Sequence, residues 1–135
     1  MTENPISLVQ SRATAMVRAA DAMIQLLGAA AVAVRLPMAT TLVGPALSTV
    51  SEDLALAPVH VRQVANDSNG RRRFELLASA TSLNAMCDSQ GVDDVDEMLT
   101  TAIGVIYGDS LLRVAAVSSD RTAGVPYLYR IEVTE

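Results

Sequence analysis

The sequence predicts an α+β fold, in which a long N-terminal amphipathic helix packs on an antiparallel β-sheet or small barrel of five to six strands, with two short helices between residues 81 and 103. Two observations lead to this prediction. Apolar residues recur with a helical period through the first 27 residues. Alternating segments separated by turn-forming clusters fill most of the remainder. The chain has 135 residues, half of them apolar, and we expect one domain spanning residues 1–135.

The N-terminal helix is predicted over residues 5–27. Asn4 and Pro5 are a typical helix start, and Gly28 is a typical stop. A helix of this length extends about 35 Å. It either lies across a sheet or also contacts a neighbouring subunit, because the apolar residues are spaced as in a helix–helix seam. They are Ile6, Val9, Ala13, Met16, Ala20, Met23 and Leu27. Our candidate subunit contacts among them are Ile6, Val9, Met16 and Met23.

The next two segments are predicted to differ in regularity. Residues 31–38 resemble a first strand that ends near Pro37. Residues 39–53 contain Gly44 and Pro45, and their apolar positions are irregularly spaced. We therefore expect an irregular loop over 39–53 that is mobile or becomes ordered on a partner.

A β-hairpin is predicted over residues 54–79, with its turn in the polar cluster 66–70. Pro58 favours an edge strand or a strand start in the first arm. The second arm opens with the one concentrated basic feature of the chain: Arg71, Arg72 and Arg73. These arginines are either solubilising charges on an edge strand or contacts to an acidic partner surface or phosphates.

The last third of the chain, residues 104–135, predicts three antiparallel strands over 105–107, 111–117 and 125–134, and so a C-terminal hairpin over 105–134. In the final strand one face is apolar and carries Val125, Tyr127, Tyr129, Ile131 and Val133. The other face carries Leu128, Arg130, Glu132 and Thr134. We expect the first face in the core and the second against water or a neighbour.

Composition limits the classes of function. The net charge of −5 opposes general or sequence-specific binding of nucleic acid through phosphates. The single cysteine excludes an internal disulfide and fits a reducing compartment. The N-terminal segment lacks the basic and apolar regions of a signal peptide, and no stretch approaches the roughly 18 apolar residues of a membrane span. We expect a protein made in the cytoplasm, without a membrane partner.

Residues capable of chemistry are few and scattered. His60 is the only histidine, and Cys87 has Asp88 beside it, which disfavours the thiolate. The acidic residues of 93–97 have helical spacing and do not follow the calcium-loop pattern. No glycine-rich phosphate motif is present. We therefore expect no enzyme, no cofactor and no metal site, and leave a small binding domain or an enzyme using His60 and Cys87 as the alternative.

The order of strands and turns from residue 74 to residue 134 resembles a known family. A short strand with a glycine turn (105–109), an aliphatic run with a central arginine (111–117), a polar turn (118–124) and a closing strand (127–133) follow one another. This is similar to tailed-phage neck proteins of the head–tail joining, or head-closure, type. The helix over 5–27 departs from that type and is more like the N-terminal helix of tail-terminator proteins.

The resemblance implies a virion structural protein without turnover or cofactor. Such a subunit would form a homo-oligomeric ring at the head–tail junction, contact portal, adaptor or tail-tube proteins, and surround passing DNA without gripping it. It would be made in the host cytoplasm and then reside in the virion. A tail terminator or another tail structural protein is the alternative within the same class.

Overall fold

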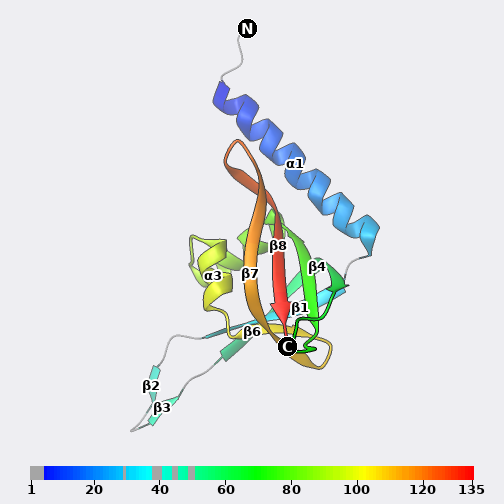
Figure 1. The fold of residues 1–135 in the computed structure, drawn as a ribbon. Helices are drawn as coiled ribbons and strands as arrows, with labels where there is room; N and C mark the ends of the chain where they lie inside the picture. Colours follow the sequence, from blue (N-terminus) through cyan, green and yellow to red (C-terminus); the bar gives the residue numbers. More distant parts are fainter. Residues whose placement is uncertain (1–4, 29, 38–40, 44–45, 49–50) are drawn as a thin grey trace.

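A closed barrel of six antiparallel strands forms the body of the protein in the computed structural model, which describes residues 5–28, 30–37, 41–43, 46–48 and 51–135 (Figure 1). The strand order around the barrel is β1-β4-β5-β8-β7-β6, and β6 pairs with β1 to close it. The barrel strands are β1 (Ala30–Pro37), β4 (Ser51–Val64), β5 (Arg73–Ser79), β6 (Gly104–Tyr107), β7 (Ser110–Thr122) and β8 (Val125–Thr134). The other elements are α1 (Pro5–Leu27), β2 (Thr41–Val43), β3 (Ala46–Ser48), α2 (Ala80–Gln90) and α3 (Val95–Thr101).

The predicted fold class is confirmed. The long helix occupies the predicted residues, α2 begins one residue before the predicted interval of the short helices, α3 lies within it, and six strands form a barrel. Because the barrel is closed, its sheet has no unpaired strand edge.

The barrel interior is filled by aliphatic side chains of moderate size. Each strand contributes inward-facing residues at alternate positions, and α2 and α3 add further apolar side chains from the connection between β5 and β6. Those with no exposed area are Val34, Val59, Leu76, Leu83, Leu99, Val105, Leu112 and Ile131. Phe74 and Tyr107 add an edge-to-face aromatic pair, with ring centroids 5.5 Å apart. This interior is the main hydrophobic core.

Local signals in the sequence fix the ends of α2 and α3. Gly91 follows α2 with a φ of 66°, the left-handed conformation that glycine adopts without a steric penalty. The Asp94 side chain accepts a hydrogen bond from the backbone N–H of Asp96 and so caps the start of α3. The acidic residues Asp96 and Glu97, from the cluster with helical spacing, lie in the first turn of α3.

Helix α1 packs on the outside of the barrel, across the strands β4, β5 and β8 (Figure 1). Ala20 and Ile24 of α1 and Leu128 of β8 form a separate small cluster. The sequence had predicted that Leu128 would face water or a neighbour. This prediction is wrong for Leu128, which is 4% exposed, because α1 covers that part of the outer face.

The residues predicted as an irregular loop, 39–53, contain regular structure where they are described. Strands β2 and β3 pair with each other in the register Thr41–Ser48, Leu42–Leu47 and Val43–Ala46. Ser51 to Asp53 open β4 and pair with β1. The prediction of irregular structure is therefore wrong for these residues, because cross-strand pairing imposed an order that their irregular apolar spacing did not indicate.

Pro58 does not mark an edge strand, and that prediction is also wrong. Strand β4 pairs with β1 on one side and with β5 on the other. The β1–β4 register shifts between the pairs Ala30–Val59 and Val32–Leu56, so two residues of β4 oppose one of β1. Pro58 is one of those two residues, and its missing N–H is tolerated at such a bulge.

Candidate interaction surface

A groove lies on the outside of the barrel between α1 and the strands beneath it. Its volume is about 310 Å³, near the lower end of the roughly 300–1,000 Å³ of ligand pockets. The lining is mainly apolar and comes from α1, β5, β7 and β8. The residues are Met16, Ala19, Ala20, Met23, Leu77, Asp120, Tyr127, Leu128 and Arg130.

The groove exists because, among the described residues of α1, part of the apolar stripe does not contact the barrel. Ala13, Ala20 and Ile24 are buried. Met16 and Met23 belong to the same apolar repeat, but each is 37% exposed. A regular α-helix has 3.6 residues per turn and a limited width of contact, so a stripe this broad cannot lie entirely against one sheet. Its outer edge remains available to another molecule.

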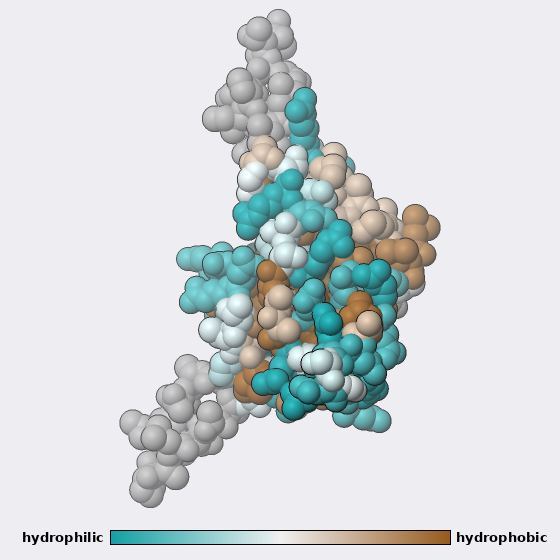
Figure 2. Space-filling view, viewed as in Figure 1, coloured by the Kyte–Doolittle hydropathy of each residue, from teal (hydrophilic) through white to brown (hydrophobic). Residues whose placement is uncertain are grey.

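The apolar surface of α1 continues beyond the groove to the end of the helix. Leu26 is 88% exposed and Leu27 is 48% exposed. In Figure 2 the brown colour of apolar residues is deepest at this end of α1. Four large apolar side chains, Met16, Met23, Leu26 and Leu27, therefore share the exposed side of a single helix. Such a concentration is typical of a contact surface.

Charged side chains next to the groove neutralise one another. Arg130 donates to Asp120 at 3.1 Å and lies 3.8 Å from Glu75, which accepts a hydrogen bond from Arg62 at 3.1 Å. The hydrogen bond to Asp120 raises the pKa of Arg130. These four side chains connect β4, β5, β8 and β7 across the outer face of the barrel. The groove thus carries two charged residues, and they pair with each other.

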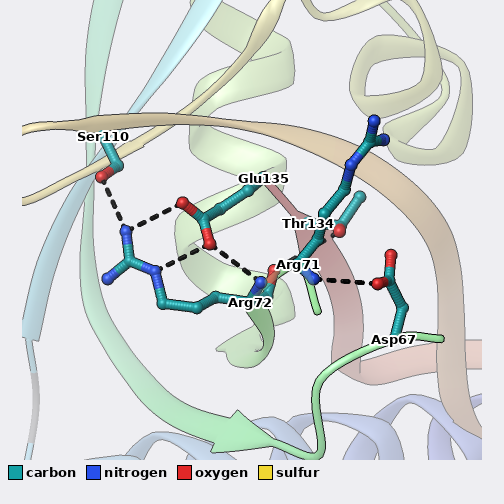
Figure 3. A network of polar contacts seen from close by, with 6 residues as sticks. All are labelled: Asp67, Arg71, Arg72, Ser110, Thr134 and Glu135. Carbon is teal, nitrogen blue, oxygen red and sulfur yellow. Dashed lines mark hydrogen bonds and ion pairs between the residues drawn. The ribbon is translucent and has the colours of Figure 1, made fainter. Parts of the chain in front are cut away.

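The three consecutive arginines lie at the opposite end of β5, where Arg72 makes side-chain contacts. Arg72 donates to the Glu135 carboxylate through Nε at 2.8 Å and Nη2 at 3.1 Å (Figure 3). Its guanidinium also lies over the Phe74 ring, 5.9 Å from the centroid. The backbone N–H of Arg71 donates to Asp67. Arg73 pairs on both sides, with Val64 and with Thr134, so the predicted edge-strand setting is wrong.

The candidate contact residues fall into two separate sets. Met16 and Met23 lie at the groove, near Leu128 of β8. Arg71, Arg72 and Arg73 lie near Glu135, seven residues further along the chain, which is roughly 20 Å along an extended strand. Ile6 and Val9 belong to α1, but their side chains lie outside the described part of the structure. The structure therefore supports a surface around Met16 and Met23, and it assigns Arg72 a role within the fold.

His60 and Cys87 are not brought together with each other or with an acidic partner in a recognisable catalytic arrangement among the described residues. His60 Nδ1 lies 3.5 Å from the carbonyl oxygen of Gly28. Cys87 is 4% exposed with its Sγ 3.7 Å from Met98 Sδ, and burial raises the pKa of its thiol. Within the described part of the chain, no three His, Cys, Asp or Glu side chains gather as they would around a metal ion.

The sequence did not predict which residues of the barrel strands line the groove. Tyr127 was predicted in the core and Leu128 against water or a neighbour, whereas both line the groove beneath α1 together with Leu77. The one available signal was Leu128, a large apolar residue on an otherwise polar strand face. An apolar residue in that setting indicates that another element covers it.

Comparison of the chain with protein-family models, curated proteins and solved structures finds no match. Among the described helices, none combines the length and the apolar character needed to cross a membrane.

Proposed function

We propose that this protein is a non-enzymatic structural subunit of a tailed-phage virion, which forms a ring at the head–tail junction in head completion, head closure or as an adaptor. The observation that carries the proposal is the exposed apolar edge of α1, which lies above a groove whose two charged residues pair with each other. A ring subunit must present such a surface to its neighbour while its own core stays closed. The C-terminal strand and turn pattern that resembles neck proteins supports the same class.

The partners in this proposal are further copies of the chain, together with portal, adaptor or tail-tube proteins above and below the ring. DNA would pass through the assembly without sequence-specific contacts, consistent with the net charge of −5. The protein would be made in the host cytoplasm and become part of the virion.

A tail terminator is the second candidate, and one observation favours it. Helix α1 precedes the barrel strands, and an N-terminal helix before the sheet is the feature that the resemblance connects with tail terminators. The two positions differ in the proteins that the ring contacts. A small binding domain or an enzyme remains the alternative outside the virion class.

Electron microscopy of purified particles tests the proposal. Antibody fragments against the folded chain should label a single position at the neck, and mass spectrometry should find the chain in intact particles. Label next to the head-proximal end of the tail tube, rather than next to the portal, would favour the tail-terminator position. A chain that is expressed during infection but absent from particles would contradict the proposal.

A further inference from the structure

The connection between β1 and β4 includes a paired ribbon that is directed away from the barrel. In Figure 1, β2 and β3 lie on the side of the molecule opposite to α1. Among the described strands, β2 and β3 pair only with each other. An isolated two-stranded hairpin is at best marginally stable in water. Within the described part of the chain, the ribbon formed by β2 and β3 therefore has no third strand to stabilise it.

The composition of this segment indicates the kind of surface that would stabilise it. From residue 36 to residue 51 the sequence contains no charged residue, and Leu42, Val43, Ala46 and Leu47 lie in its strands. Exposed hairpins normally carry charges that prevent association with other chains. An apolar and uncharged ribbon matches an apolar groove without net charge.

The ends of β1 and β4 nearest the ribbon in sequence are firmly paired in the barrel. Arg35 of β1 and Asp53 of β4 are register partners, and the guanidinium donates to the carboxylate at 2.8 Å through Nε and 3.2 Å through Nη2. These hydrogen bonds lower the pKa of Asp53. The strands continue in register to the pair Pro37–Ser51. The barrel therefore holds the described residues that precede and follow the ribbon, up to Pro37 in β1 and from Ser51 in β4.

We infer that the β2–β3 ribbon of one copy binds in the α1 groove of the next copy. The inference deepens the proposed function and rests on the ring that it requires. A chain cannot fill its own groove, since the two features lie on opposite sides of the molecule (Figure 1). A contact between two different surfaces is heterologous, and its repetition closes into a ring when the rotation per subunit allows it. The ribbon would cover Met16 and Met23, which α1 leaves exposed.

Two full-length variants separate this contact from other ways of assembling. Met23→Glu adds a charge to the groove, at a residue exposed enough to leave the fold intact. Leu42→Glu combined with Leu47→Glu adds charges to a register pair of the ribbon. Leu111→Glu, at another apolar residue that is 45% exposed but outside the groove, is the matched control. Circular dichroism of each variant should match that of the wild type.

The expected result is complementation between the two variants. Native mass spectrometry should show an oligomer for the wild type and for Leu111→Glu, and monomers for the groove variant and the ribbon variant alone. An equimolar mixture should give a heterodimer, because one intact groove and one intact ribbon remain. The two variants differ in mass, so the heterodimer is distinguishable from either homodimer.

Three results would overturn the inference. The mixture could stay monomeric, the ribbon variant could assemble like the wild type, or the wild type could remain monomeric at millimolar concentration. Assembly of the ribbon variant together with loss of assembly by Met23→Glu would indicate an α1–α1 contact instead. Particle imaging separates this inference from the proposed function. A neck ring with the ribbon outside the groove contradicts only the inference, whereas heterodimers of a chain absent from virions contradict only the function.

Discussion

The barrel interior and the contact of α1 with the barrel show two degrees of burial within one small protein. The interior contains Leu, Val and Ile side chains from six strands and two helices, many with no exposed area. The contact of α1 includes two buried alanines, the buried Ile24 and the half-buried Val17, with Leu128 as a buried partner. Burial of a large aliphatic side chain contributes about 1.5–3 kcal/mol, and an alanine contributes much less. The barrel should therefore be stable without the full contribution of α1.

The difference suggests separate tasks for the two regions. The fully packed core of the barrel defines the fold. Helix α1 packs on the barrel mainly through small residues, and its large apolar residues are therefore available to contact another molecule. Met16, Met23, Leu26 and Leu27 are exposed on α1 although the sequence pattern alone would bury most of them. Substitutions can test whether this division is real.

The largest effect is expected for Ile131→Ala. Ile131 has no exposed area and lies on β8 between β5 and β7. Removing three carbon atoms there should lower the free energy of unfolding by about 2–5 kcal/mol. Urea denaturation measures the change. Leu111→Ala, on an exposed position of β7, is the control and should cost about 0.5 kcal/mol or less. Equal costs would contradict the assignment of the core.

A charge on α1 should lower the stability of the protein strongly at a buried position and weakly at an exposed one. Ala20→Asp places an unpaired carboxylate against Ile24 and Leu128 and should cost about 2–4 kcal/mol. Met16→Asp should cost less than about 1 kcal/mol, because Met16 is 37% exposed. Thermal unfolding followed by circular dichroism compares them. The sequence alone predicts several kcal/mol at Met16 if the stripe is buried, so a large cost there would restore that interpretation.

Gly104→Ala tests how closely the barrel strands approach. A Cβ at this position would lie 2.5 Å from the Leu112 carbonyl oxygen and 2.9 Å from Leu111 Cδ1. The expected loss is about 1–3 kcal/mol, since backbone must shift to admit the methyl group. Denaturant midpoints measure it, and Gly104→Ser should cost at least as much. An unchanged midpoint would show that β6 and β7 are further apart than described.

The smallest effect is expected for Glu135→Gln, and it should depend on pH. Hydrogen bonds from Arg72 lower the pKa of Glu135 in the folded protein. The stabilisation is therefore complete above about pH 4.3, the ordinary value for an unfolded glutamate, and is lost as the pH falls through the lower folded value. Denaturation of both proteins at pH 7 and pH 3 should show a difference that shrinks at pH 3. A difference that grows on acidification would contradict this sign.

Local patterns were enough to predict most elements of the fold, but not β2 and β3 and not the relative placement of the elements. Asn4, Pro5 and Gly28 defined α1, and alternation defined the last three strands. Closure of the barrel depends on the pairing of residues 33–35 with residues 104–106, which no local pattern encodes. The groove was equally hidden, because it depends on how α1 is rotated above Leu77 and Leu128. The exposed methionines follow from that rotation and not from their spacing.

Hydrogen exchange by mass spectrometry tests the central claim most directly, which is that α1 presents an assembly surface on a self-sufficient barrel. The full chain is compared when dilute and when assembled. Amides of residues 11–27 should exchange faster than those of β5 and β8 in the dilute protein, because few buried contacts hold α1 in place. On assembly the protection of α1 should rise, while that of β5 and β8 stays unchanged. Equal protection of α1 and the barrel at every concentration would contradict the account.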